Sequence, residues 1–205
     1  MFLVGLAMFG IFFYNSLFLQ RVLGYGAIKT GATFLPMTML IIFVAPAAGR
    51  ISDRVGARWL MGGGMLLLTA SLLLFATLDA SSSWWNILPG LLVGGFGMAV
   101  VMAPTTATAM SAVPVDKAGV GSAVINSMRQ VGGSLGIAIM GALVATAVSV
   151  TPFSPAYASQ FVTGYHRALE VGAAILLLGA GLAVVTIRKV EHEPRGVAEA
   201  VVAAE

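Results

Sequence analysis

The sequence contains no cysteine, which excludes a disulfide framework and a thiolate metal site. Charge is also scarce: Asp, Glu, Lys and Arg make up 9% of the 205 residues, whereas soluble domains average about 25%. Because so few charges cannot cover a surface in contact with water, the chain is predicted to lie in a lipid bilayer.

Further absences narrow the function. The sequence has no Ser-His-Asp, Walker or His-Glu-x-x-His arrangement, and its two histidines, His166 and His192, are isolated. We therefore expect neither an enzyme nor a bound metal or organic cofactor. The isoelectric point of about 9.6 does not predict a nucleic-acid partner, because the basic residues are dispersed among short loops and form no basic face.

Apolar residues are abundant, at 59% of the chain with a mean hydropathy of +0.96. A bilayer core about 30 Å thick is crossed by a helix of about 20 apolar residues. The sequence holds six such stretches, and none has the polar face of a soluble helix. It predicts an all-α polytopic membrane protein, with transmembrane helices at about 1-19, 31-49, 60-78, 86-113, 120-150 and 168-187, and a tail at 188-205.

Basic residues between these stretches predict the orientation of the chain. One side holds more of them than the other: Arg50, Arg54, Arg58, Lys117, Arg188, Lys189 and Arg195, against Arg21, Lys29 and Arg167. The richer side is predicted to be cytoplasmic, which places both termini and the tail in the cytoplasm. Because the first stretch begins at Met1 without a polar or basic anchor, we interpret the chain as part of a longer one that starts upstream.

The segment GRISDRVGARW, residues 49–59, concentrates charge between the second and third stretches, where we expect a cytoplasmic loop. Its glycines permit tight turns, its carboxylate can cap a helix, and its arginines can pair with carboxylates or phospholipid headgroups. A simple positive-inside anchor would explain the charge alone. The spacing, however, resembles the G-x-x-x-D-R-x-G-R-[RK] signature of the major facilitator superfamily, matched at Gly49, Asp53, Arg54, Gly56 and Arg58, whereas Ala57 departs from it.

A second segment, residues 114–144, resembles the fourteen-helix drug/proton antiporter branch of that superfamily. The branch has the pattern N-x-x-R-Q-x-G-G-x-x-G, which this sequence matches at Asn126, Arg129, Gln130, Gly132, Gly133 and Gly136. The resemblance implies the C-terminal six-helix half of a major facilitator fold. It also implies a multidrug exporter of lipophilic or cationic small molecules, coupled to protons, in the bacterial plasma membrane.

Such a transporter needs two six-helix halves, so the resemblance implies a missing N-terminal half as partner, beside membrane lipid and a small-molecule substrate. Two alternatives stay open. The chain can be a half-transporter that works as a homodimer, or a six-helix membrane assembly or accessory protein that transports nothing.

The resemblance further implies that the first and fourth stretches line a central cavity. The candidates for substrate contact there are Tyr14, Asn15, Met98, Met102, Thr105 and Thr106. Methionines adapt to varied apolar shapes, although they are equally ordinary on a lipid-facing stripe. Asn15 can instead form a hydrogen bond between helices, and Pro104 is expected to kink its helix as a hinge.

In the fifth stretch, Arg129 and Gln130 are candidates for an inner gate, or for a polar network with the other half. The alternative for Arg129 is snorkelling to lipid headgroups. The three glycines that follow, Gly132, Gly133 and Gly136, form a smooth helix surface, which we interpret as a packing and rocking surface rather than simple tight packing.

Aromatic residues at Tyr157, Phe161 and Tyr165 recur every fourth position ahead of the sixth stretch. They predict a separate helix on the outer surface. Glu170 can pair with Arg167 three residues earlier, and we expect an interfacial carboxylate there rather than a proton carrier.

Overall fold

The structure is a computed structural model that describes residues 1–151, 154 and 156–186. The predicted tail and the last residue of the predicted sixth stretch lie outside these residues. The described residues form helices and no strand, which confirms the all-α prediction. In chain order these are α1 Phe2–Leu17, the π-helix η1 Phe18–Val22, α2 Ala27–Thr33, α3 Leu35–Val55, α4 Ala57–Phe75, α5 Trp84–Ser111, the 3-10 helix η2 Val115–Lys117, α6 Ala118–Ala147 and α7 Tyr157–Thr186.

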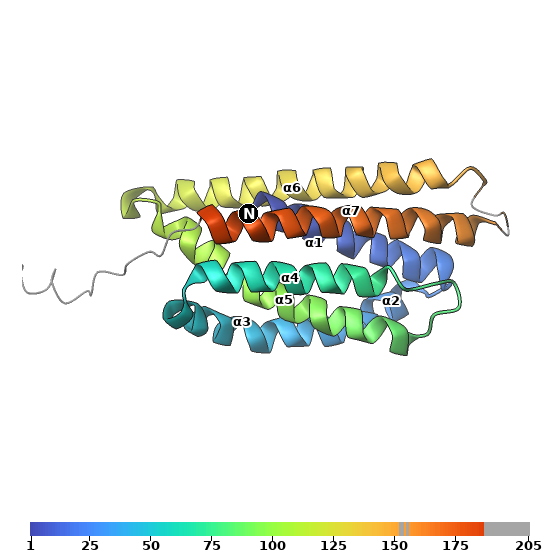
Figure 1. Cartoon of the computed structure of the whole chain (residues 1–205), viewed down its shortest axis with the longest axis horizontal. Helices are drawn as coiled ribbons and strands as arrows, with labels where there is room; N and C mark the ends of the chain where they lie inside the picture. The colour runs from blue at the N-terminus through green and yellow to red at the C-terminus, as the bar shows by residue number, and fades with distance from the viewer. Residues whose placement is uncertain (152–153, 155, 187–205) are drawn as a thin grey trace, which may run out of the picture.

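Six segments of the described chain are long and apolar enough to cross a membrane, judged by length and composition. They are Phe2–Arg21, Ala27–Ser52, Ala57–Phe75, Trp84–Ser111, Val115–Ala147 and Tyr157–Val185. Figure 1 shows them running along the long axis, with successive connections at alternate ends of the bundle. The α3–α4 and α5–α6 turns share one end, and the α4–α5 and α6–α7 connections share the other.

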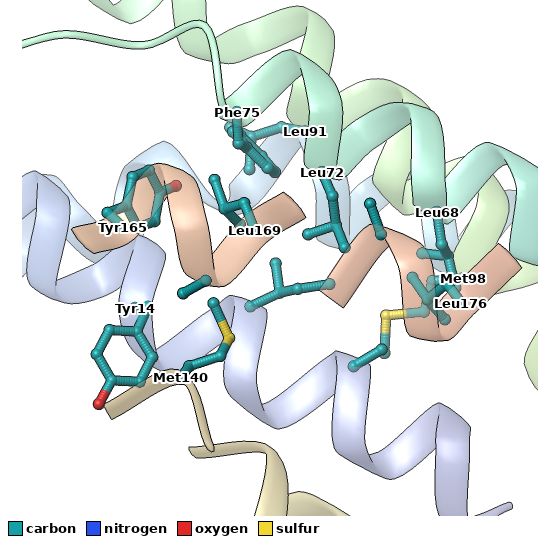
Figure 2. Packing of buried hydrophobic residues seen from close by; sticks show 14 of the residues in the cluster. Tyr14, Leu68, Leu72, Phe75, Leu91, Met98, Met140, Tyr165, Leu169 and Leu176 are labelled. Atoms are coloured by element: carbon teal, nitrogen blue, oxygen red, sulfur yellow. The ribbon is translucent and has the colours of Figure 1, made fainter. Parts of the chain in front are cut away.

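Packing places α5 against both α3 and α4, while α4 also packs on α7. On the other side of the bundle α6 packs against α1 and α7. Buried side chains of several helices meet in the middle, among them Leu72, Leu91, Leu169 and Leu176 (Figure 2). Since α1 packs on α6 and α4 on α7, as well as neighbours such as α4 and α5 on each other, the core depends on the whole set of helices.

The turn between α3 and α4 corrects the prediction of a loop at residues 49–59. Arg50 to Val55 continue α3, and Gly56 alone separates it from α4. Gly56 has φ +94°, in the left-handed region that favours glycine, so one residue is enough to reverse the chain. Arginine is a good helix former, and nothing in this segment before Gly56 stops the helix.

The second predicted stretch is likewise not one continuous helix. Phe34 separates the short α2 from α3, and Pro36 occupies the second position of α3. A proline lacks the N–H that a continuing helix would use, but it is tolerated in a first turn, where that donor has no partner. The chain therefore ends one helix and starts another at this point.

The prediction of a separate surface helix before the sixth stretch is wrong, because α7 runs unbroken from Tyr157 to Thr186. Phe161 and Tyr165 are buried, at 3% and 0% exposure, instead of edging a separate surface helix. Their spacing of four residues continues through Leu169 and Ala173, so all four lie on one buried side of a single helix.

The connection between α4 and α5 is ordered by its own polar groups. The Ser81 hydroxyl and backbone N–H donate to Asp79, and so does the Ser82 hydroxyl. These bonds, those of Ser81 above all, hold the pKa of the Asp79 carboxyl below its usual value. At the start of α5, Asn86 Oδ1 accepts from the backbone N–H of Ser83 at 2.9 Å, a capping contact across the first turn.

Candidate functional site

Asn15 and Tyr165 form a polar pair buried between α1 and α7. Their exposures are 5% and 0%, and the Tyr165 hydroxyl donates a hydrogen bond to Asn15 Oδ1. The Tyr165 ring is stacked against Phe18, at 5.0 Å between centroids, and against Phe161, at 6.4 Å. Of the two roles considered for Asn15, the structure shows the hydrogen bond between helices, which satisfies an amide that would be costly to bury alone.

The π-helix η1 follows this pair directly along the chain. Its first two residues, Phe18 and Leu19, are buried, and the backbone N–H of Tyr25 bonds to the Leu19 carbonyl at 2.9 Å. A π-turn inserts an extra residue into helical register and is frequent at functional sites. Here the π-helix places the Phe18 ring against the face of the Tyr165 ring, so that the end of α1 packs on α7.

Met98 lines an apolar cavity of about 20 Å³ between α1, α3, α4 and α5. Its other lining residues include Ile11, Phe12, Met37 and Leu68. A space of this size holds about one water molecule, and an apolar lining keeps such a space dry. Pockets for drug-sized ligands measure about 300–1,000 Å³, so this cavity is a packing defect and not a drug pocket.

The remaining cavity candidates lie along α1 and α5. Tyr14 is 7% exposed and lies over Gly141 of α6, where a methyl group would meet the tyrosine hydroxyl at 2.5 Å. Thr105 is buried, whereas Thr106 is exposed and Met102 is half-buried. Tyr14, Asn15, Met98 and Thr105 thus face other helices of this chain, and Thr106 faces outward.

Pro104 lies within α5, where it removes the N–H that would reach the carbonyl four residues earlier. The two threonines that follow bond back along the helix: Thr105 Oγ1 donates to the Val101 carbonyl at 2.6 Å, and Thr106 Oγ1 to the Met102 carbonyl at 3.0 Å. Back-bonding of this kind bends helices. The C-terminal half of α5 therefore combines two features that favour bending.

Arg129 is half-buried in α6, and its Nη2 donates to Asn126 Oδ1 at 2.6 Å on the same helix. Gln130 is exposed. The backbone carbonyl of Arg129 faces α1 so closely that a methyl group at Gly5 would overlap it. Arg129 is therefore tied to its own helix by its side chain and lies at the α1 contact by its backbone.

Glycines make the contact between α1 and α6 a close approach of backbones. A methyl group at Gly132 would overlap the Phe2 carbonyl oxygen, and one at Gly136 would overlap that of Leu6. Gly133 instead accommodates the Phe9 ring, whose nearest atom would lie 2.7 Å from an added methyl. We call this contact, made by Gly5, Gly132, Gly133 and Gly136, the glycine seam.

The residues of the charged signature gather at the α3–α4 turn. Arg50 and Arg54 are exposed, and Arg58 is half-buried with its guanidinium 5.3 Å from the Trp59 ring centre. Gly49 is near α5, where an added methyl would lie 4.0 Å from Ala103 Cβ. Asp53 lies in the last turns of α3, and its side chain is outside the described part of the chain.

Two helices stand out by how little of them the bundle covers. Only 17% of the α3 span and 28% of the α6 span are buried, against 56% for the spans of α1 and α5. The uncovered side chains include large apolar ones, such as Phe43 of α3, 75% exposed, and Val124 of α6, 54% exposed, beside exposed polar residues of α6 such as Asn126 and Gln130. Such faces are stable against lipid or another apolar helix, and not against water.

Some site residues could not have been chosen from the motifs. Tyr165 was expected on an outer edge, and its pairing with Asn15 depends on packing 150 residues apart. His166 Nε2 donates to the Leu78 carbonyl at 2.6 Å, which sequence reasoning did not foresee. Gly5 carried a signal, since a glycine within an apolar span favours close helix packing.

An all-helical bundle with six membrane-spanning segments and a glycine seam defines a polytopic membrane protein. Its family follows from comparison with known proteins: the model of the Major Facilitator Superfamily matches residues 1–137. The chain belongs to the major facilitator superfamily, which places it among transport proteins rather than enzymes.

The chain is also similar in sequence to individual proteins that are named for drug resistance or export. The chain is 34% identical over 148 residues to the multidrug resistance protein Stp of Mycobacterium tuberculosis, and 38% identical over 150 residues to the tetracenomycin C resistance and export protein of Streptomyces glaucescens. These matches cover 72% and 71% of the chain but 27% of each relative. The puromycin resistance protein pur8 of Streptomyces alboniger is 31% identical over 191 residues, which is 89% of the chain and 38% of that relative. The chain thus spans well under half the length of these relatives.

Proposed function

We propose that the chain is the C-terminal six-helix half of a drug exporter of the bacterial plasma membrane. The proposed activity is export of lipophilic or cationic small molecules in exchange for protons. The observation that carries this proposal is the similarity to three proteins named for drug or antibiotic resistance, which covers about 70–90% of the chain and 27–38% of each relative.

The uncovered faces of α3 and α6 support the need for a partner. In transporters built from two repeats, the substrate lies between them and access alternates as one rocks against the other. A half alone should then expose large apolar side chains, as α3 and α6 do, and should hold no drug-sized pocket where α1 and α5 meet. Among the proposed substrate contacts, Thr106 is exposed and Met102 is half-buried, so these two remain accessible to a substrate or a partner half.

Proton exchange requires a group that binds a proton within the membrane. Among the carboxylates whose side chains the structure describes, Asp79, Asp116 and Glu170 are all exposed, and the first two lie in connections between helices. Glu170 lies on α7 beside a polar run of Ser159, Thr163 and Arg167, which suits an interfacial carboxylate. We therefore expect the proton-binding carboxylate of the proposed exchange in the partner half.

Two other functions stay open, a homodimeric half-transporter and a membrane assembly or accessory protein. A second copy of the chain can cover the same α3 and α6 faces, which would make a homodimeric transporter. Without transport, those faces would bind another membrane protein, as in an assembly or accessory protein.

Dye accumulation separates these functions. The chain alone, and the complete reading frame that contains it, are expressed in a drug-sensitive bacterial host loaded with a fluorescent lipophilic cation. We expect lower accumulation only with the complete reading frame, and loss of the effect when a protonophore collapses the proton gradient. Lower accumulation with the chain alone would instead establish the homodimer, and no effect of either would overturn drug export.

A further inference from the structure

We propose that the α3–α4 turn binds the phosphate of an anionic phospholipid headgroup. The site consists of Arg50, Arg54, Arg58 and Trp59, which we call the basic turn. It rests on membrane insertion alone and not on drug export, so the two proposals can fail separately.

The basic turn brings three arginines to one end of the bundle, where the Arg58 guanidinium lies 5.3 Å from the Trp59 ring centre. Arg50 and Arg54 lie one helical turn apart at the end of α3. Gly56 reverses the chain, so that Arg58 lies in the first turn of α4 at the same end of the bundle (Figure 1). None of the three arginines forms an ion pair or a side-chain hydrogen bond with the described residues. With Asp53 counted, residues 49–59 carry a net charge of +2.

Arg58 has a buried hydrogen-bond donor that lacks an acceptor among the described residues. Its Nε–H is buried and donates to no group of the described chain. A buried donor without an acceptor is unfavourable, and a charged one especially so. Rotation of the side chain can present Nε and Nη together to a phosphate, the bidentate contact that arginine makes best.

Apolar side chains beside these cations distinguish a lipid from a soluble anion. Ile51 and Val55 directly follow Arg50 and Arg54 in α3, and they are 48% and 52% exposed. Trp59 is 61% exposed next to Arg58. A surface that pairs arginine forks with exposed Ile, Val and Trp fits a molecule with an anionic head and apolar chains, at the depth where tryptophan anchors a membrane protein.

The opposite end of the bundle lacks this arrangement. Its basic residues Arg21, Lys29 and Arg167 belong to different elements, and Lys29 Nζ lies 3.7 Å over the Tyr25 ring. We therefore expect selectivity for anionic lipid at the basic turn and not at the far end.

Trp59 provides the test, because the other tryptophans, Trp84 and Trp85, lie at the far end of the bundle. The purified chain with W84F and W85F is reconstituted in phosphatidylcholine containing equal fractions of brominated phosphatidylglycerol or brominated phosphatidylcholine. Quenching of Trp59 should give a relative binding constant for phosphatidylglycerol at least about fivefold above one. The W59F chain, which keeps Trp84 and Trp85, should give a value near one.

Arginine variants then assign the site. In the Trp59-only chain, Arg54→Gln should lower the relative constant but leave it above one, and R50Q/R54Q/R58Q should bring it to one. Arg167→Gln, the matched loss of an exposed arginine at the far end, should leave it unchanged. A constant of one in the Trp59-only chain, or an unchanged constant in a folded triple variant, would overturn the proposal. If the triple variant does not fold, as judged by circular dichroism, an unchanged constant in Arg54→Gln overturns it.

Discussion

At the scale of single residues, positions without a side chain determine where helices can turn and meet. Gly56 allows a turn: it is the single residue between α3 and α4, and its φ is +94°. Gly132 and Gly136 allow two helices to meet closely, since each faces a backbone carbonyl of α1. The two cases differ physically: an added methyl group has no neighbour within 4 Å at Gly56, so its cost there is conformational, whereas on α6 it is steric.

Gly56→Ala should lower the free energy of unfolding by about 1–3 kcal/mol, because a side chain strains this backbone conformation. The measurement is unfolding of the purified chain in detergent, followed by circular dichroism. Gly63→Ala is the control, since Gly63 lies within helix α4 with nothing within 4 Å of an added methyl. Equal stability of the two variants would show that the turn tolerates a side chain.

Gly136→Ala should lower the free energy of unfolding by about 1–3 kcal/mol, the usual cost of overpacking, because the methyl group overlaps the Leu6 carbonyl. Gly119→Ala in the same helix meets nothing within 4 Å, and should be neutral or stabilising by up to about 1 kcal/mol. Thermal unfolding of both variants in one detergent compares them. A stable Gly136→Ala would mean that α1 and α6 separate easily.

At the scale of elements, α7 shows how far a sequence pattern reaches. The recurrence of Tyr157, Phe161 and Tyr165 indicated a helix correctly, but not that the helix continues into the membrane with Phe161 and Tyr165 inside. Periodicity reveals one side of a helix, while the partner that covers it comes from packing. Asn15 could thus be recognised as a residue in need of a partner, but Tyr165 could not be named as that partner.

Tyr165→Phe should lower the free energy of unfolding by about 0.6–1.7 kcal/mol, the range for hydrogen bonds between helices in membranes. The ring stacking is kept, so the loss reports the hydroxyl bond to Asn15. Tyr157→Phe is the control on the same helix, because the Tyr157 hydroxyl has no hydrogen bond to a described residue. A double-mutant cycle with Asn15→Ala measures the coupling, and a coupling of zero would contradict the bond.

At the scale of the whole molecule, hydropathy was sufficient to predict an all-helical membrane protein, because six apolar runs leave few alternatives in lipid. The ends of the helices were less predictable. Charged residues suggested a loop at 49–59. Arginine is a good helix former, however, so α3 continues through the charged residues and ends only at Gly56. The candidate cavity residues depended on the family's arrangement, and their neighbours within this chain required the structure.

The orientation of the bundle is the last prediction, and it rests on charge. Positive residues near the α3–α4 and α5–α6 turns predict that this end faces the cytoplasm. Because the chain has no cysteine, single cysteines can report it without removal of others. Ser81→Cys lies in the exposed α4–α5 connection and Lys117→Cys in the exposed turn before α6, at opposite ends of the bundle.

In intact cells, a membrane-impermeant maleimide should label Ser81→Cys, and should label Lys117→Cys only after permeabilisation. The reverse pattern would invert the bundle, and it would place the basic turn in the outer leaflet. Labelling of both positions in intact cells would contradict the membrane-spanning arrangement itself. The result therefore bears on the lipid site as well, because phosphatidylglycerol bound at Arg50, Arg54 and Arg58 must be drawn from whichever leaflet this end of the bundle meets.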